Sequence, residues 1–233
     1  MIPAYNEEQR LPSTLETILA YLRSHASEYA AWEVIVVNDG SKDGTAALAK
    51  GKNVRLLENP GNKGKGYSVR HGMLEARHEW VLFSDADLSA PIDELPKLFA
   101  AAEREQAEVA IGSRALDRSL IGTHQSAFRE FGGRFFNLMV QLGTGLRLWD
   151  TQCGFKLFRR DAAQAVFQRL QVERFGFDVE ALYIARRLGY RIVEVPVRWN
   201  HVDGTKVSMA KDSVDMFGDI VRVRRNDWKG LYR

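Results

Sequence analysis

Short apolar runs alternate with longer segments of helical periodicity along the first half of the chain, and this alternation constrains the fold more than any other feature. The apolar runs occupy residues 32–37, 53–57, 80–84 and 109–111, and a strand fragment precedes Pro3. Helical patterns lie between them, at 11–29, 45–50, 67–77 and 92–104. Short apolar strands separated by helices are typical of parallel sheets covered on both faces. The sequence therefore predicts an α/β fold with a mostly parallel central sheet flanked by helices.

The second half of the chain is less regular. Helical patterns occupy 128–142, 179–188 and 209–225, and strand patterns occupy the end of 151–158 and the segment 192–199, which bends at Pro196. Neither an internal repeat nor a linker divides the chain, and 233 residues is a length typical of one domain. We therefore predict a single domain.

The charge balance and the cysteine count exclude several classes of protein. The net charge is only +3, whereas a nucleic-acid-binding protein carries a dense basic stripe. The single cysteine, Cys153, excludes an intramolecular disulfide framework and a multi-cysteine zinc site. No run reaches the roughly 18 apolar residues of a membrane span, and no signal peptide is evident. These observations predict a soluble protein of a reducing compartment that does not bind nucleic acid.

The first strand is unusually short. Only a fragment of it precedes Pro3, whereas a buried strand needs about five residues. Two explanations remain open: the start was trimmed, or the chain begins upstream of Met1. Either explanation leaves room for a membrane anchor before the first strand.

Two acidic residues, Asp85 and Asp87, follow the apolar run 81–83 directly. In an open parallel sheet, ligands bind beyond the carboxyl ends of the strands. Two carboxylates one residue apart can both face Mg²⁺ or Mn²⁺, which commonly takes one or two carboxylates together with substrate phosphate oxygens. A turn with two solvated acids is the alternative, but the polar residues after the other strands favour a metal site.

Residues 59–66 form a loop rich in glycine and lysine that opens a predicted helix. Backbone N–H groups at a helix start, together with Lys63 and Lys65, suit a phosphate or diphosphate. The loop lacks the Gly-x-x-x-x-Gly-Lys-Ser/Thr pattern, so it is not a P-loop. A flexible turn without a ligand is the alternative.

Several motifs, taken in order, carry a resemblance to a known family. They are residues 2–8 (IPAYNEE), 37–41 (VNDGS), 62–66 (NKGKG) and 85–87 (DAD). Together they resemble the family 2 glycosyltransferases with the GT-A fold, over essentially the whole chain. Residues 150–158 (DTQCGFKLF) and 177–180 (FDVE) are similar to the dolichyl-phosphate β-glucosyltransferase branch, and more distantly to dolichyl-phosphate mannose synthases. The resemblance implies an inverting enzyme that moves a hexose, with glucose expected, from a UDP-sugar to dolichyl or undecaprenyl phosphate.

The same resemblance implies a nucleotide-sugar-binding half at 1–113. The expected donor-site residues are Pro3, Ala4, Tyr5, Glu7, Asp39, Lys63, Lys65, Asp85 and Ala86. Asp39 is expected to accept a hydrogen bond from the base, since a carboxylate suits the imide N–H of uracil. Asp87 is expected to hold Mg²⁺ or Mn²⁺ directly, with Asp85 near the ribose or the metal and Ser89 as a weaker third contact. Such a metal stabilises charge on the leaving nucleotide.

An acceptor-side half is implied at 114–208. The expected acceptor-phosphate residues are Arg114, Arg129, Arg134, His201 and Lys206. Arginine offers planar, bidentate recognition of phosphate, and lysine offers a point charge. The match departs from the mannose synthases at Gly133, where they tend to have serine, and at His201, where they tend to have arginine. Asp87, Arg114 and Arg129 are the expected catalytic residues.

Asp178 lies roughly where relatives that glycosylate hydroxyl groups keep a general base. It is either such a base or an orienting acid. A phosphate acceptor is already ionised and needs no base. Its in-line attack on UDP-α-glucose would give a β-linked product.

Two helical segments offer contact with a membrane. Phe135, Phe136, Leu138, Met139 and Leu142 either touch lipid or belong to the core. The segment 209–233 mixes apolar and basic residues, so it either lies on an anionic membrane surface or packs against the domain. We predict a cytoplasmic protein that is peripheral at the cytoplasmic membrane face.

Two other functions remain open. A family 2 enzyme with a soluble or saccharide hydroxyl acceptor would need Asp178 for turnover and would barely need Arg129. A nucleotide-sugar-binding protein without catalysis is the other, and the intact pair of Asp85 and Asp87 disfavours it. No short motif distinguishes the sugar or the length of the prenol.

Overall fold

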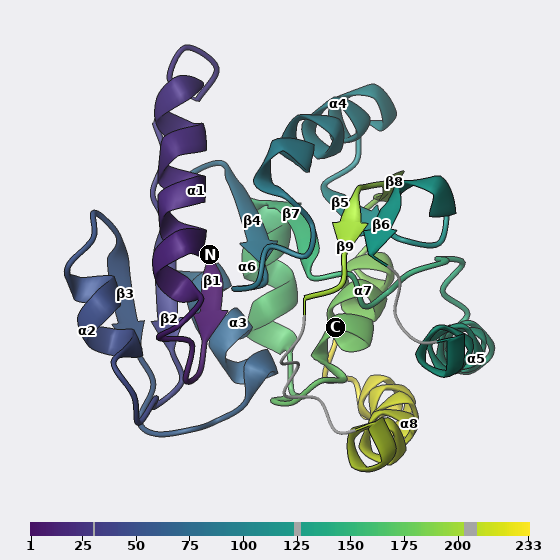
Figure 1. The fold of residues 1–233 in the computed structure, drawn as a ribbon. Helices are drawn as coiled ribbons and strands as arrows, with labels where there is room; N and C mark the ends of the chain where they lie inside the picture. Colours follow the sequence, from purple (N-terminus) through teal and green to yellow (C-terminus); the bar gives the residue numbers. More distant parts are fainter. Residues whose placement is uncertain (30, 124–126, 203–208) are drawn as a thin grey trace.

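The computed structural model describes residues 1–29, 31–123, 127–202 and 209–233, and for 127–130 and 209–217 it describes the backbone alone. Its core is a mixed sheet (Figure 1). The strands β1 (Ile2–Ala4), β2 (Ile35–Asn38) and β3 (Arg55–Glu58) pair in parallel. The strands β4 (Trp80–Ser84), β7 (Phe155–Arg159), β5 (Val109–Ser113) and β8 (Ile192–Pro196) pair in that order. Two backbone hydrogen bonds between Met1 and β4 join the two groups side by side.

Helices cover both faces of the sheet (Figure 1). One face packs on α1 (Leu11–Ser24), α2 (Thr45–Lys50) and α4 (Leu95–Glu105), which follows a 3₁₀ turn at Ile92–Glu94. The other packs on α3 (Lys65–Glu75), α5 (Ala127–Thr144), α6 (Arg160–Arg169), α7 (Phe177–Arg187) and α8 (Met209–Trp228). Two short strands, β6 (Ile121–Thr123) and β9 (Trp199–Asn200), pair with each other. A 3₁₀ turn at Arg118–Leu120 precedes β6.

Burial on both faces explains the continuous apolar runs of the sequence. In β2, Val36 packs in the cluster beneath α1, while Ile35 and Val37 pack in the cluster beneath α3. Because neighbouring strand residues point to opposite faces, a strand covered on both sides needs an apolar residue at every position. The predicted α/β fold with a mostly parallel sheet is confirmed.

The structure differs from the prediction in several elements, β6 among them. α1 ends at Ser24 rather than near residue 29, because Leu22 is the last buried residue of its apolar stripe. α6 occupies a segment for which the sequence predicts no element, and alanines make up half of its buried face, which weakens the helical pattern. β7 runs antiparallel to both of its neighbours, β4 and β5. No helix in the described part of the chain is long and apolar enough to cross a membrane.

Candidate functional site

The carboxyl ends of β1, β2 and β4 border an open cleft of about 430 Å³, which we name the acid cleft. Most of the expected donor-site residues line it: Pro3, Ala4, Tyr5, Glu7, Asp39, Lys65, Asp85 and Ala86, together with Asp87. They meet because parallel strands end at the same edge of a sheet. Lys63 is the exception, since its side chain is exposed outside the cleft and only its backbone N–H reaches Asp39.

The Asp39 carboxylate organises the loop that faces it. It is buried and accepts hydrogen bonds from the backbone N–H groups of Lys63 and Gly64, both at 2.9 Å, and from the Asn59 side chain at 2.8 Å. A carboxylate has about four acceptor sites, so these contacts leave room for one more. The contact of Asp39 with a base stays a prediction, to which the structure adds a role in shaping the glycine- and lysine-rich loop.

Two glycines let that loop pack closely against the segment before α7. Gly64 has a φ of 104°, and a Cβ there would overlap the backbone carbonyl of Glu173. A Cβ at Gly66 would overlap the carbonyl of Val172. The beginning of α3 therefore touches the backbone of 172–173 directly.

This packing brings residues to the acid cleft that the sequence does not predict. Arg174 and Phe175 line the cleft from the segment before α7, and Arg10 lines it from the segment before α1. Arg174 and Phe175 lie far from the ends of the parallel strands in sequence, so no pattern could have assigned them to the cleft, whereas Arg10 stands in the segment that follows β1.

The acids Asp85 and Asp87 sit on a tight turn at the end of β4. Leu88 adopts a left-handed conformation with a φ of 48°, which a side chain of this size rarely tolerates outside functional turns. The Thr14 hydroxyl of α1 donates to the backbone carbonyl of Ala86 at 2.6 Å. The turn is thus held from a neighbouring helix, and both carboxylates line the acid cleft.

Asp85 forms an ion pair with Lys65, with 2.7 Å between Oδ1 and Nζ. Burial would lower the pKa of Lys65, but the charges of Asp85, Asp178 and Asp87 together raise it above its ordinary value. The ammonium therefore stays charged inside the cleft. Behind Asp85 lies Gly154, where a Cβ would overlap the Asp85 carboxylate.

The role of Asp87 and Asp85 as ligands of a divalent cation stays a prediction, and both line the acid cleft. Within the described residues no three His, Cys, Asp or Glu side chains form a complete metal cage. Mg²⁺ and Mn²⁺ do not require such a cage when substrate phosphates supply the other ligands. Ser89 lies behind this turn, and its backbone N–H donates to Asp87 at 2.9 Å. Its contact with a metal stays a prediction.

A second cavity of about 120 Å³ lies on the acceptor side, and we name it the arginine pocket. Arg114 and Arg134 line it, as does Gly133. Its remaining lining residues include Arg118, Phe136, Asn137, Trp149, Asp150, Thr151, Gln152 and Trp199. The side chain of Arg129 and the whole of Lys206 lie outside the described residues. His201 stacks on Trp199, with 6.0 Å between the ring centres, rather than lining the pocket itself.

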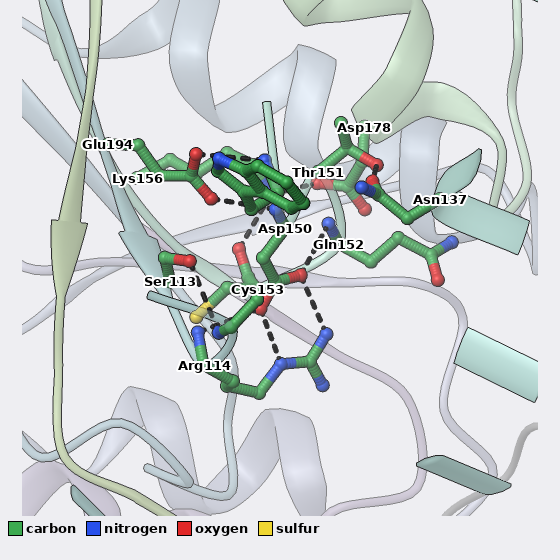
Figure 2. Close-up of polar contacts among 12 residues, drawn as sticks. Ser113, Arg114, Asn137, Asp150, Thr151, Gln152, Cys153, Lys156, Asp178 and Glu194 are labelled. Atoms are coloured by element: carbon green, nitrogen blue, oxygen red, sulfur yellow. Dashed lines mark hydrogen bonds and ion pairs between the residues drawn. The ribbon is translucent and has the colours of Figure 1, made fainter. Parts of the chain in front are cut away.

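Asp150 holds the Arg114 guanidinium in a fork (Figure 2). Its two oxygens accept from Nε at 2.7 Å and Nη2 at 2.8 Å, and one of them also accepts the Arg114 backbone N–H at 3.0 Å. The guanidinium also lies over the Trp199 ring, at 5.4 Å from its centre. Burial would raise the pKa of Asp150, but the Arg114 charge and hydrogen bonds hold it below its ordinary value. Arg114 is thus fixed in one orientation at the pocket.

Asp178 does not reach either cavity. It is 5% exposed, on the first turn of α7, and accepts a hydrogen bond from the buried ammonium of Lys156 on β7 (Figure 2). Burial raises the pKa of Asp178, and the charges of Lys156 and Lys65 oppose that rise. This placement supports the orienting acid rather than the base. Lys156 belongs to the DTQCGFKLF motif, but the sequence alone predicts no function for it.

The family model for glycosyl transferase family 2 matches residues 1–167. This chain belongs to glycosyl transferase family 2. The match covers β1 to β7 and most of α6, and so contains Asp85 and Asp87 of the acid cleft and both partners of the Arg114–Asp150 fork. The family resemblance of the sequence is confirmed.

Within this family, the chain is similar to curated proteins that share one name. The dolichyl-phosphate β-glucosyltransferase of Drosophila melanogaster is 44% identical over 223 residues, which is 89% of this chain and 68% of that protein. The protein of the same name from Homo sapiens is 36% identical over 248 residues, covering 100% of this chain and 76% of that one. The Saccharomyces cerevisiae protein of that name is 33% identical, with coverage of 100% and 75%.

Solved structures support the fold of this family 2 chain. Glucosyl-3-phosphoglycerate synthase from Mycobacterium tuberculosis, in complex with Mn²⁺ and UDP-glucose, superposes with a TM-score of 0.67 at 19% identity, over 95% of this chain and 75% of that one. The same synthase in complex with phosphoglyceric acid gives a TM-score of 0.70 at 17% identity, over 95% and 78%. The GT-A fold implied by the sequence is confirmed.

Proposed function

We propose that this protein is an inverting glycosyltransferase that moves glucose from UDP-glucose to dolichyl phosphate or another polyprenyl phosphate. The observation that carries the proposal is the shared wall between the two cavities. Asp150, Thr151 and Gln152 line the arginine pocket, and Gly154 packs behind Asp85 of the acid cleft. A diphosphate donor and a phosphate acceptor can therefore meet across one short segment. The names of the curated relatives agree with this pair of substrates.

In this reaction an oxygen of the acceptor phosphate attacks the anomeric carbon of glucose. The bond from that carbon to the diphosphate breaks, and its electron pair leaves with UDP, so the configuration changes from α to β. Arg114 and Arg134 hold the acceptor phosphate, and Lys65 places a positive charge beside the diphosphate. Asp87 and Asp85 would hold Mg²⁺ or Mn²⁺, which would supply positive charge to stabilise the leaving diphosphate.

The direct test is product formation by the purified chain with UDP-glucose, Mn²⁺ or Mg²⁺, and dolichyl or undecaprenyl phosphate in detergent. We expect an organic-soluble glucolipid whose formation stops when a chelator removes the metal. Parallel reactions with UDP-galactose and UDP-N-acetylglucosamine identify the sugar. Binding of UDP-glucose without transfer to any lipid phosphate would refute the proposal and indicate a nucleotide-sugar-binding protein instead.

A phosphate acceptor predicts a mild effect of Asp178→Asn. A phosphomonoester has a second pKa of about 6, so it is ionised at neutral pH without help from a base. We expect Asp178→Asn to keep transfer within about tenfold of the wild type, because asparagine can still accept the Lys156 hydrogen bond. Loss of a general base would cost about 10²–10⁴-fold. A loss of that size, measured as kcat with the lipid phosphate, would favour a hydroxyl acceptor.

We also propose that α5 places the protein at a membrane surface. Phe131, Phe135, Leu138 and Leu142 are 49–72% exposed and recur every three or four residues, so they share one side of the helix. Phe136 of the same helix is buried and Met139 partly buried, so only part of the predicted apolar set faces outward. The same helix lines the arginine pocket through Gly133 and Arg134, which would put a lipid phosphate near its own bilayer.

The α5 stripe predicts vesicle binding that depends on two of its members. Phe135→Ser with Leu142→Ser should weaken co-flotation with vesicles of zwitterionic and anionic lipids at least about tenfold, since each buried apolar side chain contributes about 2 kcal/mol. Leu116→Ser with Leu231→Ser is the matched control, because both leucines are 43–46% exposed outside the stripe. Equal flotation of both double variants would contradict a role for α5. We place this membrane contact on the cytoplasmic face as part of the same proposal.

A further inference from the structure

Residues 150–154, which we name the strap, touch functional side chains at both ends. At its beginning, Asp150 forms the fork with Arg114. At its end, the Gly154 carbonyl accepts the backbone N–H of Asp85 at 3.0 Å, and its Cα lies against the Asp85 carboxylate. The strap therefore contacts one residue of the acid cleft and one of the arginine pocket.

A buried lysine donates a hydrogen bond to the backbone of the strap. Lys156 is 2% exposed, and its ammonium donates to the backbone carbonyl of Cys153 at 2.6 Å and to the carboxylate of Asp178. Lys156 stands in β7, directly opposite Phe83 of β4 and Ile111 of β5. Those two strands lead to Asp85 and Arg114, so Lys156 lies between the two strands that carry these residues.

The buried pair of Lys156 and Asp178 contributes little to the stability of the core. A buried ion pair loses hydration that its mutual attraction barely recovers, and well-packed apolar residues often replace it without loss of stability. An apolar pair could fill the space beside Phe83, whose ring lies 5.6 Å from the Lys156 nitrogen. It could not donate a hydrogen bond to the Cys153 carbonyl. The property that only the lysine supplies is therefore the fastening of the strap.

We propose that Lys156, oriented by its hydrogen bond to Asp178, is a positioning residue that aligns the donor and acceptor sites through the strap. This inference rests on the proposed glucose transfer to a lipid phosphate. Neither residue lines the acid cleft or the arginine pocket, so the effect passes through Cys153 and the two ends of the strap. Its consequence is kinetic, because each substrate can still bind when the alignment between the two sites is lost.

The test compares the double variant Lys156→Met with Asp178→Leu against the wild type. We expect kcat for glucolipid formation to fall about a hundredfold, the usual cost of a misplacement near 1 Å, while both KM values stay within about threefold. The melting temperature should stay close to that of the wild type, since the buried charges are removed together. Asp178→Asn alone should lower kcat by less than the double variant, within the tenfold range expected above, because asparagine can still accept the Lys156 hydrogen bond and leaves Lys156 bonded to Cys153.

Matched variants keep the result interpretable. Glu94→Gln neutralises another buried acid, which accepts from Arg198 and Lys97 away from both cavities, and should leave kcat unchanged. Gly154→Ala leaves the ion pair intact but displaces the end of the strap, and should lower kcat as the double variant does. An active wild type with an equally active double variant would overturn the role of Lys156. A wild type without any transfer would instead refute the proposed function.

Discussion

Asp87→Asn is expected to lower kcat for glucose transfer about a thousandfold, the largest effect of any single substitution in the acid cleft. Asparagine keeps the shape of the side chain and can still accept the backbone N–H of Ser89, so the turn should stay folded. It removes the negative charge that would hold a divalent cation against the diphosphate. The measurements are the transfer rate and the Mn²⁺-dependent binding of UDP, which should weaken together.

A matched acid outside the cleft provides the control. Asp93 is half exposed and pairs with Arg198 at 2.6 Å, so Asp93→Asn removes the same charge from the surface near α4. It should change neither the rate nor UDP binding. An Asp87→Asn enzyme that keeps more than about a tenth of wild-type activity in excess metal would show that Asp85 carries the cation without it.

Arg114→Lys is expected to raise KM for the lipid phosphate about a hundredfold. Lysine keeps the charge, but it cannot bind Asp150 through two nitrogens and present a third to a ligand. The donor side should be unaffected, with KM for UDP-glucose within about twofold. The experiment varies the acceptor concentration at saturating donor and compares the two KM values.

The control for this substitution is a second arginine fork. Arg159 binds both oxygens of Asp161 at 2.7 Å on the surface, so Arg159→Lys makes the same chemical change away from both cavities. It should leave both KM values unchanged. Equal acceptor KM values for Arg114→Lys and the wild type would show that phosphate is held elsewhere, at Arg134 or at Arg129.

Much of the acid cleft follows from the order of the sequence. Tyr5, Asp39 and Asp85 each come directly after a strand, and parallel strands leave all three at one edge of the sheet. The local sequence pattern is enough to predict these cleft residues, because strands buried on both faces must be continuously apolar. The ligand-binding residues then follow directly after the strands. The motifs on these loops then identify the family.

The acceptor side was harder to predict, since its contacts join residues distant in sequence. An arginine that belongs to a pocket looks the same in sequence as one in solvent, and only the partner Asp150, 36 positions away, distinguishes Arg114. Phe135 and Phe136 are neighbours in an apolar helix, yet one is 49% exposed and the other 6%. The direction in which α5 faces the domain decides between them, and no local pattern encodes it.

By itself, the sequence determined the α/β fold, the family, and the acids and glycines at the strand ends, because these depend on the periodicity of burial and on short motifs. The tertiary structure decided which charges act together. In the folded sheet, β7 lies antiparallel between β4 and β5, which places Lys156 beside Asp178. The same position of β7 lets the strap contact both Arg114 and Asp85. A strand's direction and its neighbours follow from the packing of the whole sheet, so the link between the two cavities is visible only once the chain is folded.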